Sequence, residues 1–132
     1  MIEKAILWLG SARHDLQAFP PDARRLAGFQ LRQIQQGLEP ADWKPMATIG
    51  PGVCEMRIHT AVEHRVYYVA KFAEAIYVLH AFEKRTRKTS KRDVELARQR
   101  YQALVALSGA WSERGKKHDE TEDHTVYREC IP

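Results

Sequence analysis

The stretch VCEMRIHTAVEHRVYYVA, from Val53 to Ala70, carries the clearest structural pattern in the sequence. In its first half Cys54, Met56 and Ile58 alternate with polar residues, and apolar residues alternate again after a short interruption. A period of two residues is typical of a β-strand with one buried face. The stretch therefore predicts two antiparallel strands joined by a hairpin connection at residues 60–63.

The segments on either side of this hairpin extend the pattern. AIYVLHAF, from Ala75 to Phe82, is apolar on both faces and predicts a central strand. Residues 21–38 place Ala23, Ala27, Leu31, Ile34 and Leu38 on one helical stripe. The predicted order is β-α-α-β-β-β-α, with further segments at 4–10 (strand), 11–19 (helix) and 90–108 (helix). This order predicts an α+β fold, an antiparallel sheet packed against helices, and we expect the helices on one face of the sheet.

The length of 132 residues indicates one domain, and the formal net charge of +4 is compatible with a nucleic-acid partner. Residues 109–132 hold six acidic and four basic side chains, so residues 1–108 carry a net charge of +6. We therefore expect a folded domain over 1–108 and a polar, mobile tail over 109–132.

The cysteine pattern and the apolar runs indicate in which cellular compartment the protein is expected. The two cysteines, Cys54 and Cys130, form neither a disulfide framework nor a metal-binding spacing. The chain start is too short and too mixed for a signal peptide, and no apolar run approaches the roughly 20 residues that span a bilayer. A cytoplasmic protein with no membrane association is the expectation.

Two arginines on neighbouring predicted strands form the first part of a candidate site. The alternation places Arg57 and Arg65 on the same side of the sheet, as near cross-strand neighbours. A planar guanidinium fits phosphate oxygens, so the pair could clamp a phosphate. The alternative is that each arginine pairs with Glu55 or Glu63, or is simply solvated.

A basic segment forms the second part. In LHAFEKRTRKTSKR, from Leu79 to Arg92, a buried strand is followed by many cations and one acid. Lys84, Arg85, Arg87 and Lys88 leave the same end of the sheet, so strand, hairpin and segment could line one cationic groove. The alternative is a solvated connection that leads into the last helix. Tyr67, on the face of Arg65, could stack a base.

Such a surface could also cleave RNA, because the 2′-OH can attack the adjacent phosphate when charge stabilisation and proton transfer are supplied. His59 and His80 are the histidines nearest the groove and are candidates for acid or base. The sequence has no phosphate-binding glycine loop, no nucleophile elbow and no His/Cys metal set. We therefore expect neither a metal nor a cofactor.

The segments EMRI, HRVYYVAK and VLHAFEKRTRKTSKRDVELARQR resemble the RelE/HigB superfamily of toxins, and in particular its phage-derived branch. The resemblance extends from about Ile6 to Leu107. It implies a RelE-like α+β domain and a toxin of a type II toxin–antitoxin module, most of which are mRNA endoribonucleases that in many cases act on the ribosome. It also implies an antitoxin partner with a helix-turn-helix domain, whose acidic segment could cover the groove.

The resemblance assigns roles where positions match. Arg65 matches a phosphate-contacting arginine, and Lys84 and Arg85 match a basic pair that stabilises the transition state. Arg57 matches a basic position on the preceding strand, and Lys88 is a weaker match. Some relatives have a tyrosine or histidine where this chain has Thr89, Ser90 and Lys91. A non-catalytic module that binds nucleic acid or protein, or a domesticated member with a regulatory role, therefore stays open.

Overall fold

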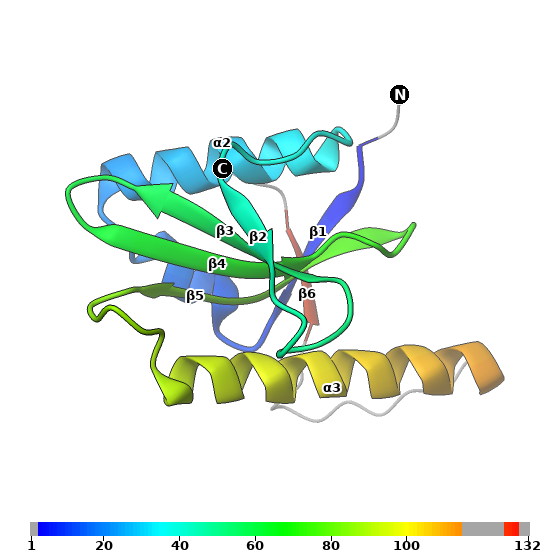
Figure 1. Cartoon of the computed structure of the whole chain (residues 1–132). Coiled ribbons are helices and arrows are strands. Elements are labelled where there is room, and N and C mark those ends of the chain that lie inside the picture. The colour runs from blue at the N-terminus through cyan, green and yellow to red at the C-terminus, as the bar shows by residue number, and fades with distance from the viewer. Residues whose placement is uncertain (1–2, 115–125, 130–132) are drawn as a thin grey trace.

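The computed structural model describes residues 3–114 and 126–129, which form one sheet with helices on both of its faces (Figure 1). The sheet has six strands in the order β2-β3-β4-β5-β1-β6, and β1 lies parallel to β5. The strands are β1 (Ala5–Leu9), β2 (Trp43–Pro45), β3 (Val53–His59), β4 (Glu63–Val69), β5 (Ala75–Glu83) and β6 (Val126–Glu129). The helices are α1 (Ala12–Gln17), α2 (Pro21–Gln35) and α3 (Lys91–Arg114).

The hairpin predicted for Val53–Ala70 is present as β3 and β4. Its register places Met56 opposite Val66 and Arg57 opposite Arg65. The antiparallel strands, the two preceding helices and the following helix confirm the predicted α+β fold. The predicted element order is found as well, with the short strands β2 and β6 added to it.

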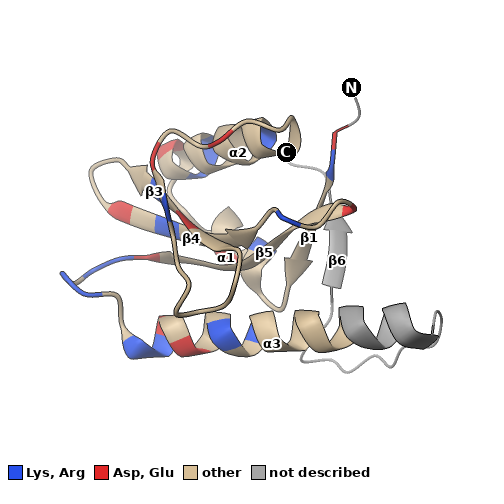
Figure 2. Cartoon of the chain, turned by 45° about the vertical axis from the view of Figure 1, so that its right-hand side comes forward, with Lys and Arg blue, Asp and Glu red and all other residues tan. Residues whose placement is uncertain are grey.

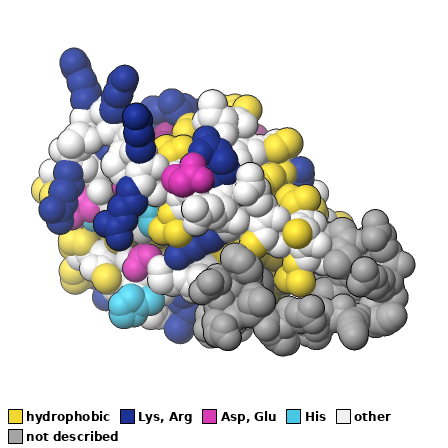
Figure 3. Space-filling view, turned by 90° about the horizontal axis from the view of Figure 1, so that it is seen from below, with side chains coloured by type: hydrophobic (Ala, Val, Ile, Leu, Met, Phe, Trp, Pro, Cys, Tyr) yellow, Lys and Arg dark blue, Asp and Glu magenta, His cyan; other side chains and the backbone are white. Residues whose placement is uncertain are grey.

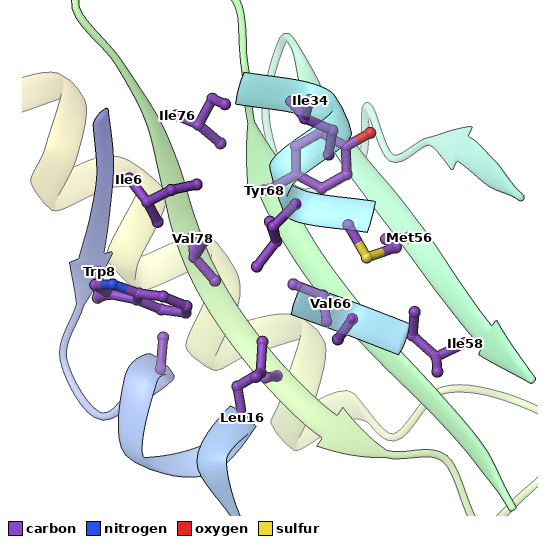
Figure 4. Close-up of a cluster of buried hydrophobic side chains, with 14 of the residues drawn as sticks. Ile6, Trp8, Leu16, Ile34, Met56, Ile58, Val66, Tyr68, Ile76 and Val78 are labelled. Carbon is purple, nitrogen blue, oxygen red and sulfur yellow. The ribbon is translucent and has the colours of Figure 1, made fainter. Parts of the chain in front are cut away.

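One face of the sheet packs against α1 and α2 (Figure 4). Met56 and Ile58 of β3, together with Val66 and Tyr68 of β4, point to this side, as their alternation predicts. They meet a buried stripe on α2 that consists of Ala23, Ala27, Leu31 and Ile34. Leu38 does not extend this stripe: it is 55% exposed, because α2 ends at Gln35 and the chain turns at Gly37, whose φ is 87°.

The opposite face is covered as well, by α3. Tyr67 and Leu79 of the sheet lie in one buried cluster with Ala97, Tyr101 and Leu104 of α3. The prediction that the helices lie on one face was therefore wrong. Strand β5 and the second half of β4, from Val66 to Val69, are apolar on both sides, and such strands are stable only when each face is buried.

Strand β5 is the central strand that its composition predicts. It lies between β4 and β1, and every residue from Ala75 to Phe82 is buried. Its pairing with β4 is irregular between Tyr67 and Tyr68, where the register shifts as at a β-bulge. Beyond this shift, residues 80–83 of β5 pair regularly with residues 64–67 of β4.

Three further details differ from the sequence-based expectation. Trp43–Pro45, within the expected connection, forms the edge strand β2, a position that tolerates proline. Helix α3 continues past Gly109 to Arg114, and Val126–Glu129 pairs with β1, so the chain beyond residue 108 is not entirely outside the fold. The rest of the predicted mobile tail, 115–125 and 130–132, lies outside the described residues.

A pair of substitutions on α2 tests this packing. Leu31 is fully buried and Phe29 is 57% exposed. We expect Leu31→Ala to lower the free energy of unfolding by about 2–5 kcal/mol, because it leaves a cavity, and Phe29→Ala to change it by about 0.5 kcal/mol or less. Urea unfolding followed by circular dichroism measures both. Equal losses in the two variants would contradict the assignment of the buried face.

Candidate nucleic-acid interface

Three strands place nine side chains on the α3 side of the sheet in three cross-strand rows. The register of β3 with β4 and of β4 with β5 fixes these rows. The first row is Glu55, Tyr67 and His80; the second is Arg57, Arg65 and Phe82; the third is His59, Glu63 and Lys84. We call this set the three-row face. Burial decreases along it: all members of the first row are buried, whereas the third row is partly or fully exposed.

The two arginines of the middle row are directly opposite one another, as the alternation predicts. A buried carboxylate lies between them, since Oε1 of Glu55 is 3.0 Å from Nε of Arg57 and 3.8 Å from Nε of Arg65. Nη1 of Arg65 is 2.8 Å from Oε1 of Glu63. The structure thus shows the ion pairs of the alternative interpretation, and these contacts offset the repulsion between the two cations.

The two arginines differ in how much of the guanidinium a ligand can reach. The Arg65 side chain is 9% exposed and also donates a hydrogen bond from Nη1 to the carbonyl oxygen of His64. The Arg57 side chain is 31% exposed. Arg57 can therefore offer donors to a phosphate from outside, while Arg65 acts from within the protein.

The basic segment, residues 84–92, follows the third row at the rim of the three-row face. The backbone N–H of Lys84 bonds to Glu63, and its ammonium donates to the carbonyl oxygens of Thr86 (2.9 Å) and Arg87. Lys84 therefore shapes the turn that follows it. Arg85 is 79% exposed, with only a 3.6 Å contact to Glu83.

The remaining cations of the basic segment lack acidic partners. Within the part of the chain that the structure describes, no ion pair involves Arg87, Lys88, Lys91 or Arg92. Figure 2 shows these Lys and Arg positions along the link from β5 and the first turn of α3. In Figure 3 dark-blue side chains gather at this end of the face seen from the α3 side. The positive potential of the site thus comes mainly from the basic segment.

The start of α3 is fixed to the sheet by a short chain of hydrogen bonds. Ser90 accepts from the backbone N–H of Asp93 at 3.1 Å and donates to its carboxylate at 2.7 Å, so Ser90 is the N-cap of α3. The other carboxylate oxygen of Asp93 is 2.7 Å from Nε2 of His80. This chain of contacts sets where the basic segment ends.

His80 is not available as an acid or base in this structure. It is 5% exposed and stacks on Phe82, with ring centroids 5.0 Å apart. Burial lowers the pKa of His80, and the hydrogen bond with Asp93 offsets only part of that effect. Because its Nε2 is bonded to Asp93 and its ring is buried against Phe82, His80 is a structural contact of α3.

Tyr67 is likewise inaccessible for the predicted stacking of a base. Its side chain is fully buried and its ring packs against Phe82 at 5.3 Å. Burial raises the pKa of Tyr67 to about 12. A base could reach this ring only if α3 and Phe82 moved away.

His59 is the accessible histidine of the three-row face. Its Nε2 is 2.6 Å from Asp42 and its Nδ1 is 2.8 Å from Glu63, so both ring nitrogens face carboxylates. These two hydrogen bonds, led by the one to Asp42, raise the pKa of His59, while the contacts with Arg65 and His59 lower that of Glu63. Asp42 has no periodic signal in the sequence, because it lies in the connection before β2.

Among residues 3–114 and 126–129, no group of three or more His, Cys, Asp and Glu side chains could hold a metal ion. No helix in this described part is long and apolar enough to cross a membrane.

The fold and this surface define a small α+β protein with one strongly basic rim beside paired arginines. A family model described as phage-derived protein Gp49-like (DUF891) matches residues 14–102, which include the three-row face and the basic segment. The chain therefore belongs to the phage-derived Gp49-like family, which is a RelE-like toxin family. No curated protein matches the chain.

The bridging histidine leads to a pH prediction. Because its folded-state pKa is raised, the contribution of His59 to stability is full below its ordinary pKa of about 6.5 and is lost as the pH rises through the folded-state value. The Glu63 contribution has the opposite sign and is lost as the pH falls. We expect the stability difference between the parent protein and His59→Gln to shrink from about pH 6 to about pH 9.

Two measurements check this prediction. Urea unfolding at a series of pH values gives the stability difference, and NMR titration of the His59 ring gives its pKa directly. A ring midpoint at or below the ordinary value would show that the bridge to Asp42 and Glu63 does not form in solution.

Proposed function

We propose that the chain is the toxin of a type II toxin–antitoxin module and that it cleaves mRNA as an endoribonuclease on the ribosome, in the cytoplasm. The observation that carries this proposal is the set of cations at 87–92, which form no ion pair with any described residue, beside the exposed row of the three-row face. Membership in a RelE-like toxin family supports the same function.

The proposed reaction starts with the RNA backbone across the rim. Arg57, Arg87 and Lys88 hold neighbouring phosphates, and Arg85 with Lys84 contacts the scissile one. The 2′-oxygen then forms a bond to phosphorus while the bond to the 5′-oxygen breaks, so the products are a 2′,3′-cyclic phosphate and a 5′-hydroxyl. Arg65, Lys84 and Arg85 stabilise the negative charge that develops on the phosphorane.

Proton transfer has one accessible candidate in the described part of the site. His59 is exposed and its raised pKa favours the protonated ring, which would give a proton to the leaving 5′-oxygen once that oxygen replaces Glu63 at Nδ1. Water or a second group on the RNA side would then accept the proton of the 2′-OH. His80 takes no part in this scheme, because it is buried against Phe82.

The proposed partner is an antitoxin with a helix-turn-helix domain. An acidic segment of that protein would lie along the basic segment and pair with Arg87 and Lys88. Charge complementarity over an exposed cationic rim supports this assignment. A small reading frame beside the gene that relieves toxicity on co-expression would supply the partner.

A second candidate function is a non-catalytic module that binds nucleic acid through the same rim. The ion pairs of Arg57 and Arg65 with Glu55 and Glu63 favour this alternative, since they neutralise the cations closest to the sheet. Binding without cleavage is the outcome that distinguishes the two functions.

Inducible expression with mapping of mRNA 5′ ends tests the proposed cleavage. We expect the parent chain to stop growth and create new 5′ ends. The double variant Arg57→Ala/Arg85→Ala should reduce cleavage at least about tenfold, since one lost phosphate contact of about 1.4 kcal/mol has that effect. Arg65→Ala is less suitable, because it removes a side chain that is only 9% exposed and contacts both Glu55 and Glu63, whereas Arg57 is 31% exposed and its removal leaves Arg65 beside Glu55.

The matched control is Arg25→Ala/Arg32→Ala on the exposed side of α2. It removes the same charge from the far face of the sheet, where neither arginine forms an ion pair with any described residue. Normal growth with no new 5′ ends for the parent would reject the nuclease function. Cleavage that persists in Arg57→Ala/Arg85→Ala would place the site elsewhere.

The salt dependence of RNA binding tests whether the two arginines contact phosphates, independently of whether the RNA is cleaved. For single-stranded RNA we expect the slope of log K against log salt to fall by about 1.4 in Arg57→Ala/Arg85→Ala, since each phosphate contact contributes about 0.7. An unchanged slope would exclude both arginines from the interface, whichever of the two functions holds.

A further inference from the structure

The end of β5 has a free edge next to the parallel strand β1. Strand β1 pairs with β5 only as far as Trp8 opposite Val78, and then turns at Gly10 into α1. Strand β5 continues for five more residues, to Glu83. Among the described residues no strand lies beside this last part of β5 on the β1 side.

The backbone groups on this edge are identified by the ladder with β4. Lys84 donates its N–H to Glu63, and in an antiparallel pair the bonding residues alternate. Residues 80 and 82 therefore bond to β4, and Ala81 and Glu83 direct their N–H and C=O groups to the free side. The carbonyl of Leu79, just before them, accepts a hydrogen bond from Nη1 of Arg100 at 2.9 Å.

A pocket of about 460 Å³ lies along this edge, and Ala81 and Glu83 are part of its wall. Helix α1 forms one side of it and the first turn of α3 forms the other. Phe19 and Phe82 supply apolar surface. The space thus continues the line of β1 beyond the point where β1 ends.

The charged side chains around the pocket are mainly acidic. Asp15 comes from α1, Glu83 from the edge itself and Asp93 from α3. The cations are Arg92 on the wall and Arg100, whose guanidinium bonds to Ser11 of the wall and to the carbonyl of Leu79. The acidic sign of this wall is opposite to that of the basic segment, although Glu83 and Lys84 are consecutive. Three carboxylates oppose an RNA phosphate here and favour a cationic ligand.

Two buried histidines on the pocket wall have unsatisfied atoms. His64 is 1% exposed, its ring lies 4.3 Å from that of Phe19, and its Nδ1 has no hydrogen-bond partner among the described residues. Nδ1 of His80 is in the same situation. Buried polar atoms without partners are uncommon in a complete interface, so this wall has hydrogen-bonding capacity left over.

We propose that this edge pocket binds an extended, basic segment of a partner protein as an additional strand of the sheet. The backbone of that segment bonds to Ala81 and Glu83, and its Lys or Arg side chains lie against Asp15 and Asp93. Strand addition of this kind takes affinity from main-chain hydrogen bonds and selectivity from alternate side chains. The proposal goes beyond the proposed function and does not depend on RNA cleavage.

NMR of the full chain labelled with ¹⁵N tests the proposal with three probes. These are the acetylated and amidated peptides VRVRV and VEVEV, and arginine amide. We expect VRVRV to shift the Ala81 and Glu83 amide signals and to slow their hydrogen exchange. Binding of VEVEV should be at least about tenfold weaker, which corresponds to about 1.4 kcal/mol.

A matched pair of variants tests whether the pocket carboxylates contribute to the binding of VRVRV. Asp15→Lys should weaken VRVRV binding at least about fivefold, while Asp22→Lys on α2, outside the pocket, should leave it unchanged. Since the peptide comparison uses the unaltered chain, it still decides the question if Asp15→Lys does not fold.

Several outcomes would overturn the proposal. No binding of VRVRV at millimolar concentration would do so, as would equal binding of VRVRV and VEVEV. Arginine amide that reproduces the shifts while the Ala81 and Glu83 amides stay unprotected would show a cation pocket and not strand addition. None of these results bears on the mapping of mRNA 5′ ends, so the two proposals fail independently.

Discussion

The burial of β5 on both faces is the constraint on which the rest of this fold depends. From Ala75 to Phe82 every residue is covered, by α1 on one side and α3 on the other. A strand of this kind stays ordered up to the last residue that its helices cover. Burial then ends within one step of the chain, between the buried Phe82 and the exposed Glu83. This step fixes where on the rim the basic segment begins.

Two surfaces of opposite charge lie at the end of β5, because successive side chains of a strand point to opposite faces of the sheet. Lys84 belongs to the α3 side with Arg57 and Arg65, whereas Glu83 lines the pocket beside α1. A cationic rim and an acidic pocket can therefore lie within one or two residues of each other without neutralising one another. Any partner that orders the edge of β5 would also act on the position of Lys84, through one peptide bond.

Much of this arrangement was predictable because it follows from short-range periodicity. The alternation in β3 and β4 predicted that Arg57 faces Arg65, and the apolar composition of β5 predicted a central strand; both are confirmed. The covering of the second face was missed, although Tyr67 and Val69 already made the second half of β4 apolar on both sides. The burial of Tyr67 and the role of Asp42 depend on contacts between distant segments, which no local pattern encodes.

The carboxylate of Glu55 has a consequence for any phosphate that approaches the arginine pair. It already supplies one negative charge to Arg57 and Arg65 from inside the protein. Glu63 supplies a second negative charge to Arg65, so the two guanidinium groups are already charge-matched before a phosphodiester approaches. Internal counterions of this kind hold the two arginines side by side when no ligand is bound, and a phosphate would have to compete with them for the guanidinium donors.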